Sequence, residues 1–193
     1  MSKLREAFEK GEFAITAEMA PPKGTDLSHL AECAKLVIGR VHAANVTDNQ
    51  SAVMRTSSLA TCKMLKDLGL EPVIQMTGRD RNRIAIESEM LSAGFFGIDN
   101  LLALTGDHVC VGDHKQAKPV FDLDAVSILS TATMMNNGTD STGLELKGKT
   151  DFFLGACVTP EYDPIEVQLL KMEKKIKAGA KFFQTQAVYD IEN

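Results

Sequence analysis

The sequence predicts an α/β fold of the (β/α)8 barrel class, with about six βα units present. Two observations predict it. Short apolar, β-rich segments alternate with segments of helical period, and a polar residue follows each of these strands at intervals mostly near 30 residues. One parallel strand and its crossover helix need about that length. The polar residues at the strand ends are Glu18, Thr47, Thr77, Asp107, Thr159 and Gln186.

The individual elements follow from the period of their apolar residues. The predicted strands are 13–17, 44–46, 73–76, 101–104, 152–158 and 182–183. The predicted helices, each with an apolar face, are 26–41, 56–68, 82–93, 122–135 and 164–178. Pro164 suits a first helical turn, and Gly69, Gly94 and Gly179 are expected where helices stop.

Strands alternating with helices fit either an open, doubly wound sheet or a barrel. An open sheet of the nucleotide-binding type is expected to have a glycine-rich loop after its first strand. Here that strand is followed by the segment 21–24, Pro-Pro-Lys-Gly, which is no such loop. A barrel gathers its active site where the strands end, and every predicted strand here ends in a polar residue. The sequence therefore favours the barrel.

A closed barrel needs eight strands, whereas the chain of 193 residues supplies six. An open edge would leave backbone groups unpaired and apolar side chains exposed. We therefore expect residues 1–193 to be a single catalytic-barrel domain that is incomplete at its C-terminus, with roughly 60 further residues required to close it.

Composition narrows the function classes. A net charge of −5 and a pI near 5.4 argue against a nucleic-acid or anionic-membrane partner. No apolar run is long enough for a membrane helix, and the N-terminus shows no secretory signal, so we expect a cytoplasmic protein. The four cysteines include no C-x-x-C pair, and the spacing of Asp107-His108 and Asp113-His114 matches no metal motif. We expect no metal site.

Two carboxylates are the leading candidates for chemistry. Glu18 ends an apolar strand beside Met19, and partial desolvation there would favour the protonated form that a general acid needs. The alternative is a solvated glutamate at a strand end. Asp107 follows the apolar run 101–104 and Gly106, which allows close backbone approach to a ligand. The alternative for Asp107 is an ordinary turn.

Basic residues offer weaker signals. The segment 78–83 contains Arg79, Arg81 and Arg83, which could bind a phosphate or carboxylate of a ligand. Its alternating charges also suit a self-paired, solvated helix start. Lys175 belongs to a basic helix face, which is more often solvated but would allow this residue to reach a pyrophosphate.

In combination, these segments make the sequence resemble the methylenetetrahydrofolate reductase family, and the motifs are most similar to those of its bacterial and archaeal branch. The likeness extends over almost the whole chain. Its segments include Thr105-Gly106-Asp107 and Thr185-Gln186, each of low specificity alone but specific in this order and spacing. The matching segments are 17–22, 45–49, 69–77, 104–108, 112–114, 120–124, 155–156 and 178–186.

The resemblance implies a flavin-containing barrel that reduces 5,10-methylenetetrahydrofolate to 5-methyltetrahydrofolate by hydride transfer from the reduced flavin. It implies that Glu18 is the general acid that helps open the folate's five-membered ring. It implies that Asp107 lies beside the flavin and the pterin, where its charge stabilises the cationic iminium. It implies a substrate site of Glu18, Asp107 and Gln186, the last pairing with the pterin through its amide.

The resemblance also implies a flavin site, FAD with FMN as the alternative, and an electron donor that reduces the flavin again. The cofactor-binding residues it implies are Thr47, Asp48, Gln75, Thr105, Gly106, Asp107, Phe121, Thr159 and Lys175. Gln75, Thr105, Thr159 and Asp163 depart from the enteric pattern of histidine, arginine, tyrosine and histidine. The electron donor is therefore NADH, NADPH or another donor, with a partner subunit among the alternatives. We expect a homo-oligomer at full length.

Two other function classes fit the same residues. The first is a non-catalytic flavin- or pterin-binding subunit of a larger assembly. The second is a pterin-dependent methyltransferase barrel, which needs no flavin.

Overall fold

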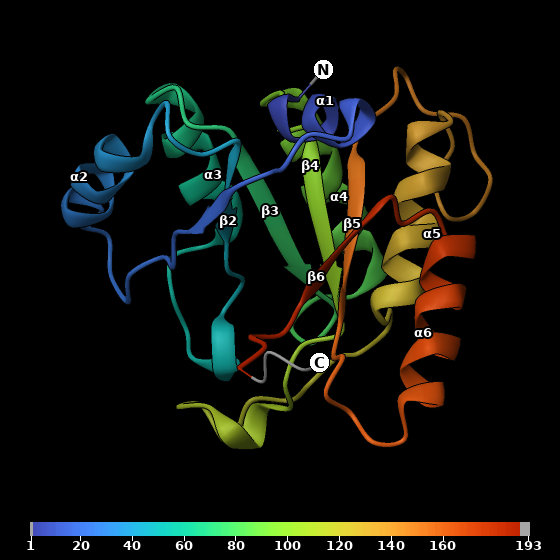
Figure 1. The fold of residues 1–193 in the computed structure, drawn as a ribbon. Helices are drawn as coiled ribbons and strands as arrows, with labels where there is room; N and C mark the ends of the chain where they lie inside the picture. The colour runs from blue at the N-terminus through green and yellow to red at the C-terminus, as the bar shows by residue number, and fades with distance from the viewer. Residues whose placement is uncertain (1, 190–193) are drawn as a thin grey trace.

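The computed structural model describes residues 2–189 and contains one sheet of six parallel strands. The strands pair in chain order from β1 to β6, so that β1 and β6 form the two edges. Figure 1 shows the sheet curling around an open side that faces the viewer, with α2 to α6 on its outside. This is the predicted α/β architecture in the form of a curled half-barrel, consistent with a partial (β/α)8 barrel.

The elements alternate as the sequence predicts. The strands are β1 (Thr16–Glu18), β2 (Ala43–Val46), β3 (Pro72–Thr77), β4 (Asn100–Leu104), β5 (Phe153–Val158) and β6 (Phe182–Thr185). The α-helices are α1 (Lys3–Lys10), α2 (Ser28–Val37), α3 (Ser58–Asp67), α4 (Arg83–Phe95), α5 (Ala125–Asn136) and α6 (Ile165–Lys177). Two short 3-10 helices, η1 (Gln50–Ala52) and η2 (Val109–Val111), follow β2 and β4.

Successive residues of each strand face opposite sides of the sheet, which separates two apolar clusters. The larger cluster packs the sheet against the helices and includes Ile74, Leu101 and Leu154. The smaller cluster lies on the inner face and includes Val73 and Leu102 with Phe153 and Phe182. The inner face thus has its own apolar floor, and polar side chains follow it towards the strand ends.

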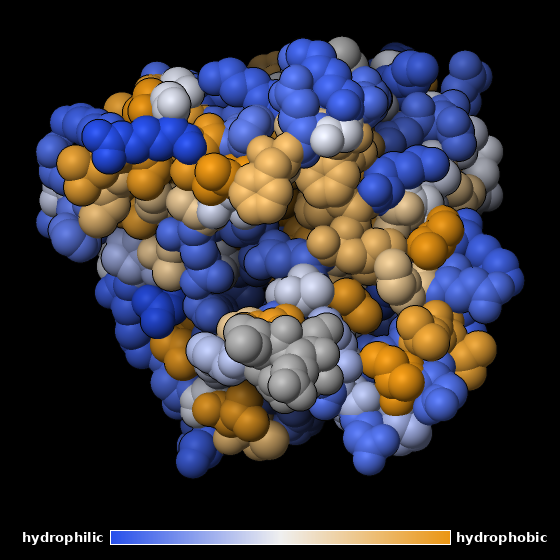
Figure 2. Space-filling model, viewed as in Figure 1, coloured by the Kyte–Doolittle hydropathy of each residue, from blue (hydrophilic) through white to orange (hydrophobic). Residues whose placement is uncertain are grey.

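Helix α1 closes the amino-terminal end of the half-barrel, and the sequence analysis did not predict it. Ser2 caps it by accepting a hydrogen bond from Arg5 N, and its hydroxyl donates to Asn100 Oδ1 at 2.7 Å. Leu4 is buried in the inner cluster, and Phe8 packs against the rings of the inner floor. In Figure 2, apolar residues gather over the open face just below this helix.

Several predicted boundaries were wrong for local reasons. The first strand begins at Thr16, and Phe13 lies before it with 86% of its surface exposed. Helix α4 runs through Gly94 to Phe95, and the chain reverses at Gly97, which has a φ of +68°. Helix α5 begins after Asp124, because that carboxylate caps it by accepting from Ser127 N at 2.8 Å. In the described part of the chain, no helix combines the length and hydrophobicity needed to cross a membrane.

Candidate active site

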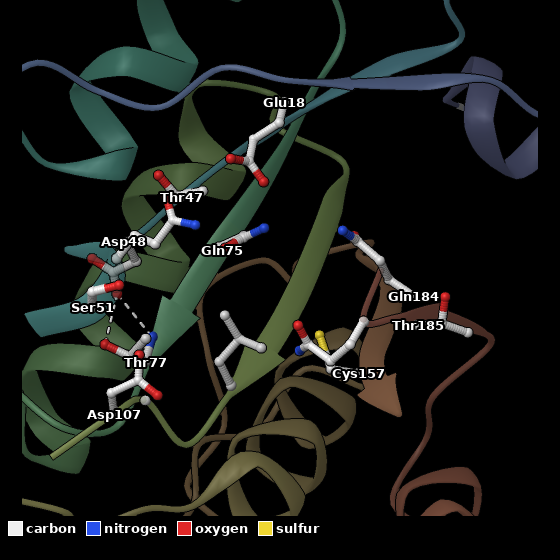
Figure 3. A pocket seen from close by; sticks show the side chains of 14 residues that line it. Glu18, Thr47, Asp48, Ser51, Gln75, Thr77, Asp107, Cys157, Gln184 and Thr185 are labelled. Carbon is white, nitrogen blue, oxygen red and sulfur yellow. Dashed lines mark hydrogen bonds between the residues drawn. The ribbon is translucent and has the colours of Figure 1, made fainter. Parts of the chain in front are cut away.

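A cavity of about 450 Å³ lies at the carboxyl-terminal ends of the strands. Figure 3 shows side chains from β1, β3 and β6 pointing into it, including Glu18, Gln75 and Gln184. The structure brings together seven of the predicted site residues here. These are Glu18, Thr47, Asp48, Gln75, Gly106, Asp107 and Gln186.

The cavity is acidic. Glu18, Asp48 and Asp107 all line it, and among the described lining residues there is no lysine, arginine or histidine. Glu18 is exposed, which contradicts the expected desolvation, because β1 is an edge strand with a neighbour on one side only. Asp107 is exposed as well, whereas Asp48 is 4% exposed. A cavity with this charge favours a neutral or cationic ligand group and disfavours a phosphate.

Asp48 is held from within the protein. Its Oδ2 accepts hydrogen bonds from Thr77 N at 2.8 Å and Thr77 Oγ1 at 2.9 Å, as Figure 3 shows, and also one from Arg81. Arg81 also donates to Glu89 Oε2 at 2.7 Å. Burial would lower the pKa of Arg81, but the two carboxylates outweigh it and raise that pKa. The buried Asp48 therefore keeps a permanently charged counter-ion.

Neutral polar groups complete the cavity wall. Thr47 Oγ1 is buried and has no hydrogen-bond partner among the described residues. Gln75 is 7% exposed, and Gln184 reaches in from the opposite side of the cavity (Figure 3). Leaving a buried hydroxyl unpaired costs about 1–3 kcal/mol, which a ligand at this wall would offset. Amides and a hydroxyl suit a ring with a donor–acceptor edge.

Four predicted cofactor residues do not line the cavity. Thr105 Oγ1 accepts from Ala125 N at 3.2 Å at the start of α5. The ring of Phe121 stacks on His108, with 6.3 Å between the ring centroids. Thr159 follows β5 and accepts a backbone bond from Tyr162 N.

The fourth of these residues, Lys175, lies behind the cavity wall. Its Nζ donates to Cys157 O at 2.5 Å, and Cys157 itself lines the cavity. Burial lowers the pKa of Lys175 and raises the pKa of the Cys157 thiol. Lys175 therefore approaches the cavity without contributing to its surface.

Sequence reasoning missed several lining residues. They are Gln50, Ser51, Leu104, Cys157, Gln184 and Thr185, while Thr77 was placed at the strand ends without a role in the site. A signal for Gln184 was present, because alternate residues of a strand share a face and Gln186 was already placed at the rim. No sequence signal pointed to Ser51, which belongs to a segment where Asn49, Ser51 and Ala52 all have a positive φ. Such backbone conformations concentrate at functional sites.

The wall groups fit the ring of a flavin or a pterin. The unpaired Thr47 hydroxyl offers a hydrogen bond, and a lining without lysine, arginine or histidine among residues 2–189 suits an uncharged ring. Gly106, with a φ of +90°, allows the backbone after β4 to pass close to β3, because a Cβ there would lie only 3.2 Å from Thr77 Cβ. Within residues 2–189, no three histidine, cysteine or acidic side chains form a metal-binding group.

Comparison with solved structures supports the fold. Crystal structures of 2,3-dimethylmalate lyase, a member of the PEP mutase/isocitrate lyase superfamily, match in a trigonal and a triclinic crystal form with TM-scores of 0.65 and 0.63. Each is 12% identical in sequence, and the match covers 100% of this chain. This chain spans only 64% and 66% of the length of those two chains. At that identity the likeness concerns the fold alone.

Comparison with protein families gives a more specific result. The sequence model described as methylenetetrahydrofolate reductase matches residues 3–193, and this range includes all the lining residues of the cavity. Because the match extends over nearly the whole sequence, the chain belongs to the methylenetetrahydrofolate reductase family.

Proposed function

We propose that this protein contributes the active site for reduction of 5,10-methylenetetrahydrofolate to 5-methyltetrahydrofolate, with a flavin as the hydride donor. The observation that supports this most directly is the acidic cavity, which is lined by Glu18, Asp48 and Asp107 from three strand ends; among the described residues only Asp48 has a basic partner, Arg81, and that partner does not line the cavity. The reaction passes through a cationic iminium on the folate, and such a cavity favours a positive charge. The family membership supports the same reaction.

Glu18 is the proposed general acid. It ends β1, points into the cavity and is open to solvent, so it can acquire a proton and pass it to a folate ring nitrogen. Protonation of that nitrogen breaks its bond to the bridging carbon and leaves the iminium on the other nitrogen. In this proposal Glu18 alone supplies the proton that opens the ring.

Asp107 and Gln186 orient and stabilise the substrate in this proposal. Asp107 places a negative charge in the cavity, which stabilises the iminium before the hydride arrives. Gln186 offers an amide with both a donor and an acceptor to the pterin edge. Neither residue has a side-chain hydrogen bond to another described residue that would compete with this role.

A bound flavin would supply the hydride. Thr47 and Gln75 would hold its ring at the wall described above, and Asp48 would stay paired with Arg81 beside it. The acidic lining disfavours the phosphates of FAD or FMN, so these groups would be held outside the cavity itself. NADH or NADPH is the proposed electron source.

The test separates flavin reduction from folate reduction. The purified protein is loaded with FAD or FMN, reduced anaerobically with NADH and mixed with 5,10-methylenetetrahydrofolate, and flavin absorbance is followed. Glu18→Gln should slow the reoxidation by about 100-fold or more, because general acids contribute at least that factor, while the reduction by NADH is unchanged. Glu12→Gln, which alters a carboxylate outside the cavity lining, should react as the parent does.

Each contrary result identifies the part that is wrong. Reoxidation of Glu18→Gln at the parent rate removes the general-acid role. A protein that binds folate but neither flavin favours a pterin-dependent methyltransferase. A protein that binds both without hydride transfer favours a binding subunit of a larger assembly.

A further inference from the structure

Arg79 is a buried cation outside the cavity. Its side chain is 2% exposed, yet the residue does not line the active-site cavity. Its guanidinium is bound to one carboxylate by two bonds, from Nε to Asp80 Oδ1 at 2.8 Å and from Nη2 to Asp80 Oδ2 at 2.7 Å. The hydrogen bond with Asp80 raises the pKa of Arg79 and lowers the pKa of Asp80. The arginine is therefore permanently charged and already paired.

The remaining guanidinium bonds reach two neighbouring connections. Nη2 donates to Asn49 O at 3.1 Å, in the segment after β2, and Nη1 donates to Asp107 O at 3.3 Å, in the segment after β4. One planar group thus links the ends of three adjacent strands. A lysine could not make these bonds together, because its three N–H groups share one nitrogen.

Arg79 also meets both ends of the long connection that contains Asp107, residues 105–121. Near its start, Gly106 packs so closely that a Cβ there would lie 3.2 Å from Arg79 Cβ. Near its end, Val120 N donates to Arg79 O at 2.8 Å, and Phe121 N donates to Gly78 O at 3.1 Å. The connection, which follows β4, is therefore bound near its start by the Arg79 guanidinium, through Asp107 O, and near its end by the Arg79 backbone carbonyl.

We propose that Arg79 is a positioning residue that clasps residues 105–121 at both ends and so fixes Asp107 in the cavity. This inference rests on the proposed function only for the role of Asp107 towards the substrate. The contacts of Arg79 with residues 105–121 are formed within the protein and need no ligand.

The first experiment needs no ligand. Arg79→Lys keeps the positive charge but removes the guanidinium hydrogen bonds to Asp107 O and Asn49 O. The rate of amide hydrogen exchange in residues 105–121 should therefore increase roughly tenfold. The matched control is Arg5→Lys, because Arg5 also binds a single aspartate, Asp151: its Nη1 donates to both carboxylate oxygens, at 3.1 and 3.0 Å, and its Nη2 donates to the backbone carbonyl at 2.8 Å. It lies in α1, and its replacement should leave exchange in 105–121 within about twofold of the parent.

The second experiment is a double-mutant cycle on the flavin reoxidation rate with 5,10-methylenetetrahydrofolate. Arg79→Lys should lower the rate about tenfold in the parent and less than about twofold in Asp107→Asn, because residues in contact couple. A residue with a merely structural role would give the same factor in both backgrounds.

The outcomes separate this inference from the proposed function. Faster exchange in 105–121 with no flavin or folate binding would support the clasp and reject the proposed function. Unchanged exchange, or equal factors in the cycle, would overturn the clasp even in an active enzyme.

Discussion

Replacing Gly155 by alanine should destabilise the protein, because the inner face of β5 has no room for a methyl group. Gly155 lies opposite Phe182 of β6 in the parallel register. An added Cβ would lie 2.1 Å from the Phe182 ring, against the roughly 3.4 Å or more of ordinary contact. The ring cannot simply shift, since it stacks on Phe153 with 5.1 Å between centroids and also contacts Phe8.

Overpacking of this kind costs about 1–3 kcal/mol. For a chain of this size, 1 kcal/mol corresponds to about 2–4 °C in the unfolding midpoint, so Gly155→Ala should lower the Tm by about 2–12 °C. Differential scanning calorimetry measures this shift directly. Gly24→Ala is the matched control, because no atom lies within 4 Å of its added Cβ and its φ is not left-handed.

A second variant tests the cause of the effect. Phe182→Leu removes the ring atoms that the new methyl group meets, so Gly155→Ala should cost less in that background than in the parent. Equal Tm values for Gly155→Ala and Gly24→Ala would refute the steric argument. An equal loss in both Phe182 backgrounds would show that the ring is not the obstacle.

Two further predictions concern ion pairs. Arg81→Met leaves Asp48 buried without its counter-ion and should cost about 3–5 kcal/mol in urea unfolding, whereas Lys177→Met, which breaks an exposed pair with Glu173, should cost less than about 1 kcal/mol. Similar costs would contradict the burial argument. Arg83 lowers the pKa of Asp122 to about 2, so that this pair stabilises the fold above pH 4 and is lost as the pH falls to 2. The destabilisation by Asp122→Asn should shrink over that interval, and a constant difference would contradict the linkage.

The sequence predicted the architecture because the strands of a parallel sheet are buried on both faces, and such strands read as short continuous apolar runs between the helical segments. The polar residue after each apolar run marked the rim, and this put Glu18 and Asp107 in one cavity although 89 positions separate them. Helix α1 was missed, although Ser2 before it and Gly11 after it are typical capping residues. Its packing on the inner floor is tertiary, and the sequence pattern did not indicate a partner for it.

The arginine segment shows what sequence could not decide. Alternating charges in 78–83 were compatible with ligand binding or with a solvated helix start. In the structure Arg79 pairs with its sequence neighbour Asp80, as the self-paired alternative expected, although Arg79 is buried rather than solvated. Arg81 is an internal counter-ion for Asp48, which the end of β2 brings next to it. The Arg81–Asp48 pair depends on strand order and register, which the sequence pattern does not give. These pairs account for two of the arginines that, in the described part of the chain, do not line the cavity.

The burial of Ser2 against Asn100 has a practical consequence for handling the protein. Ser2 lies at the amino-terminal end of the half-barrel, where α1 begins (Figure 1). The cavity lined by the carboxylates lies at the carboxyl-terminal ends of the strands, so residues fused before Ser2 would leave the molecule at the opposite end. A protein immobilised on a surface through an amino-terminal fusion would therefore have its cavity facing the solution. Folate or flavin could then reach an immobilised sample as freely as a dissolved one.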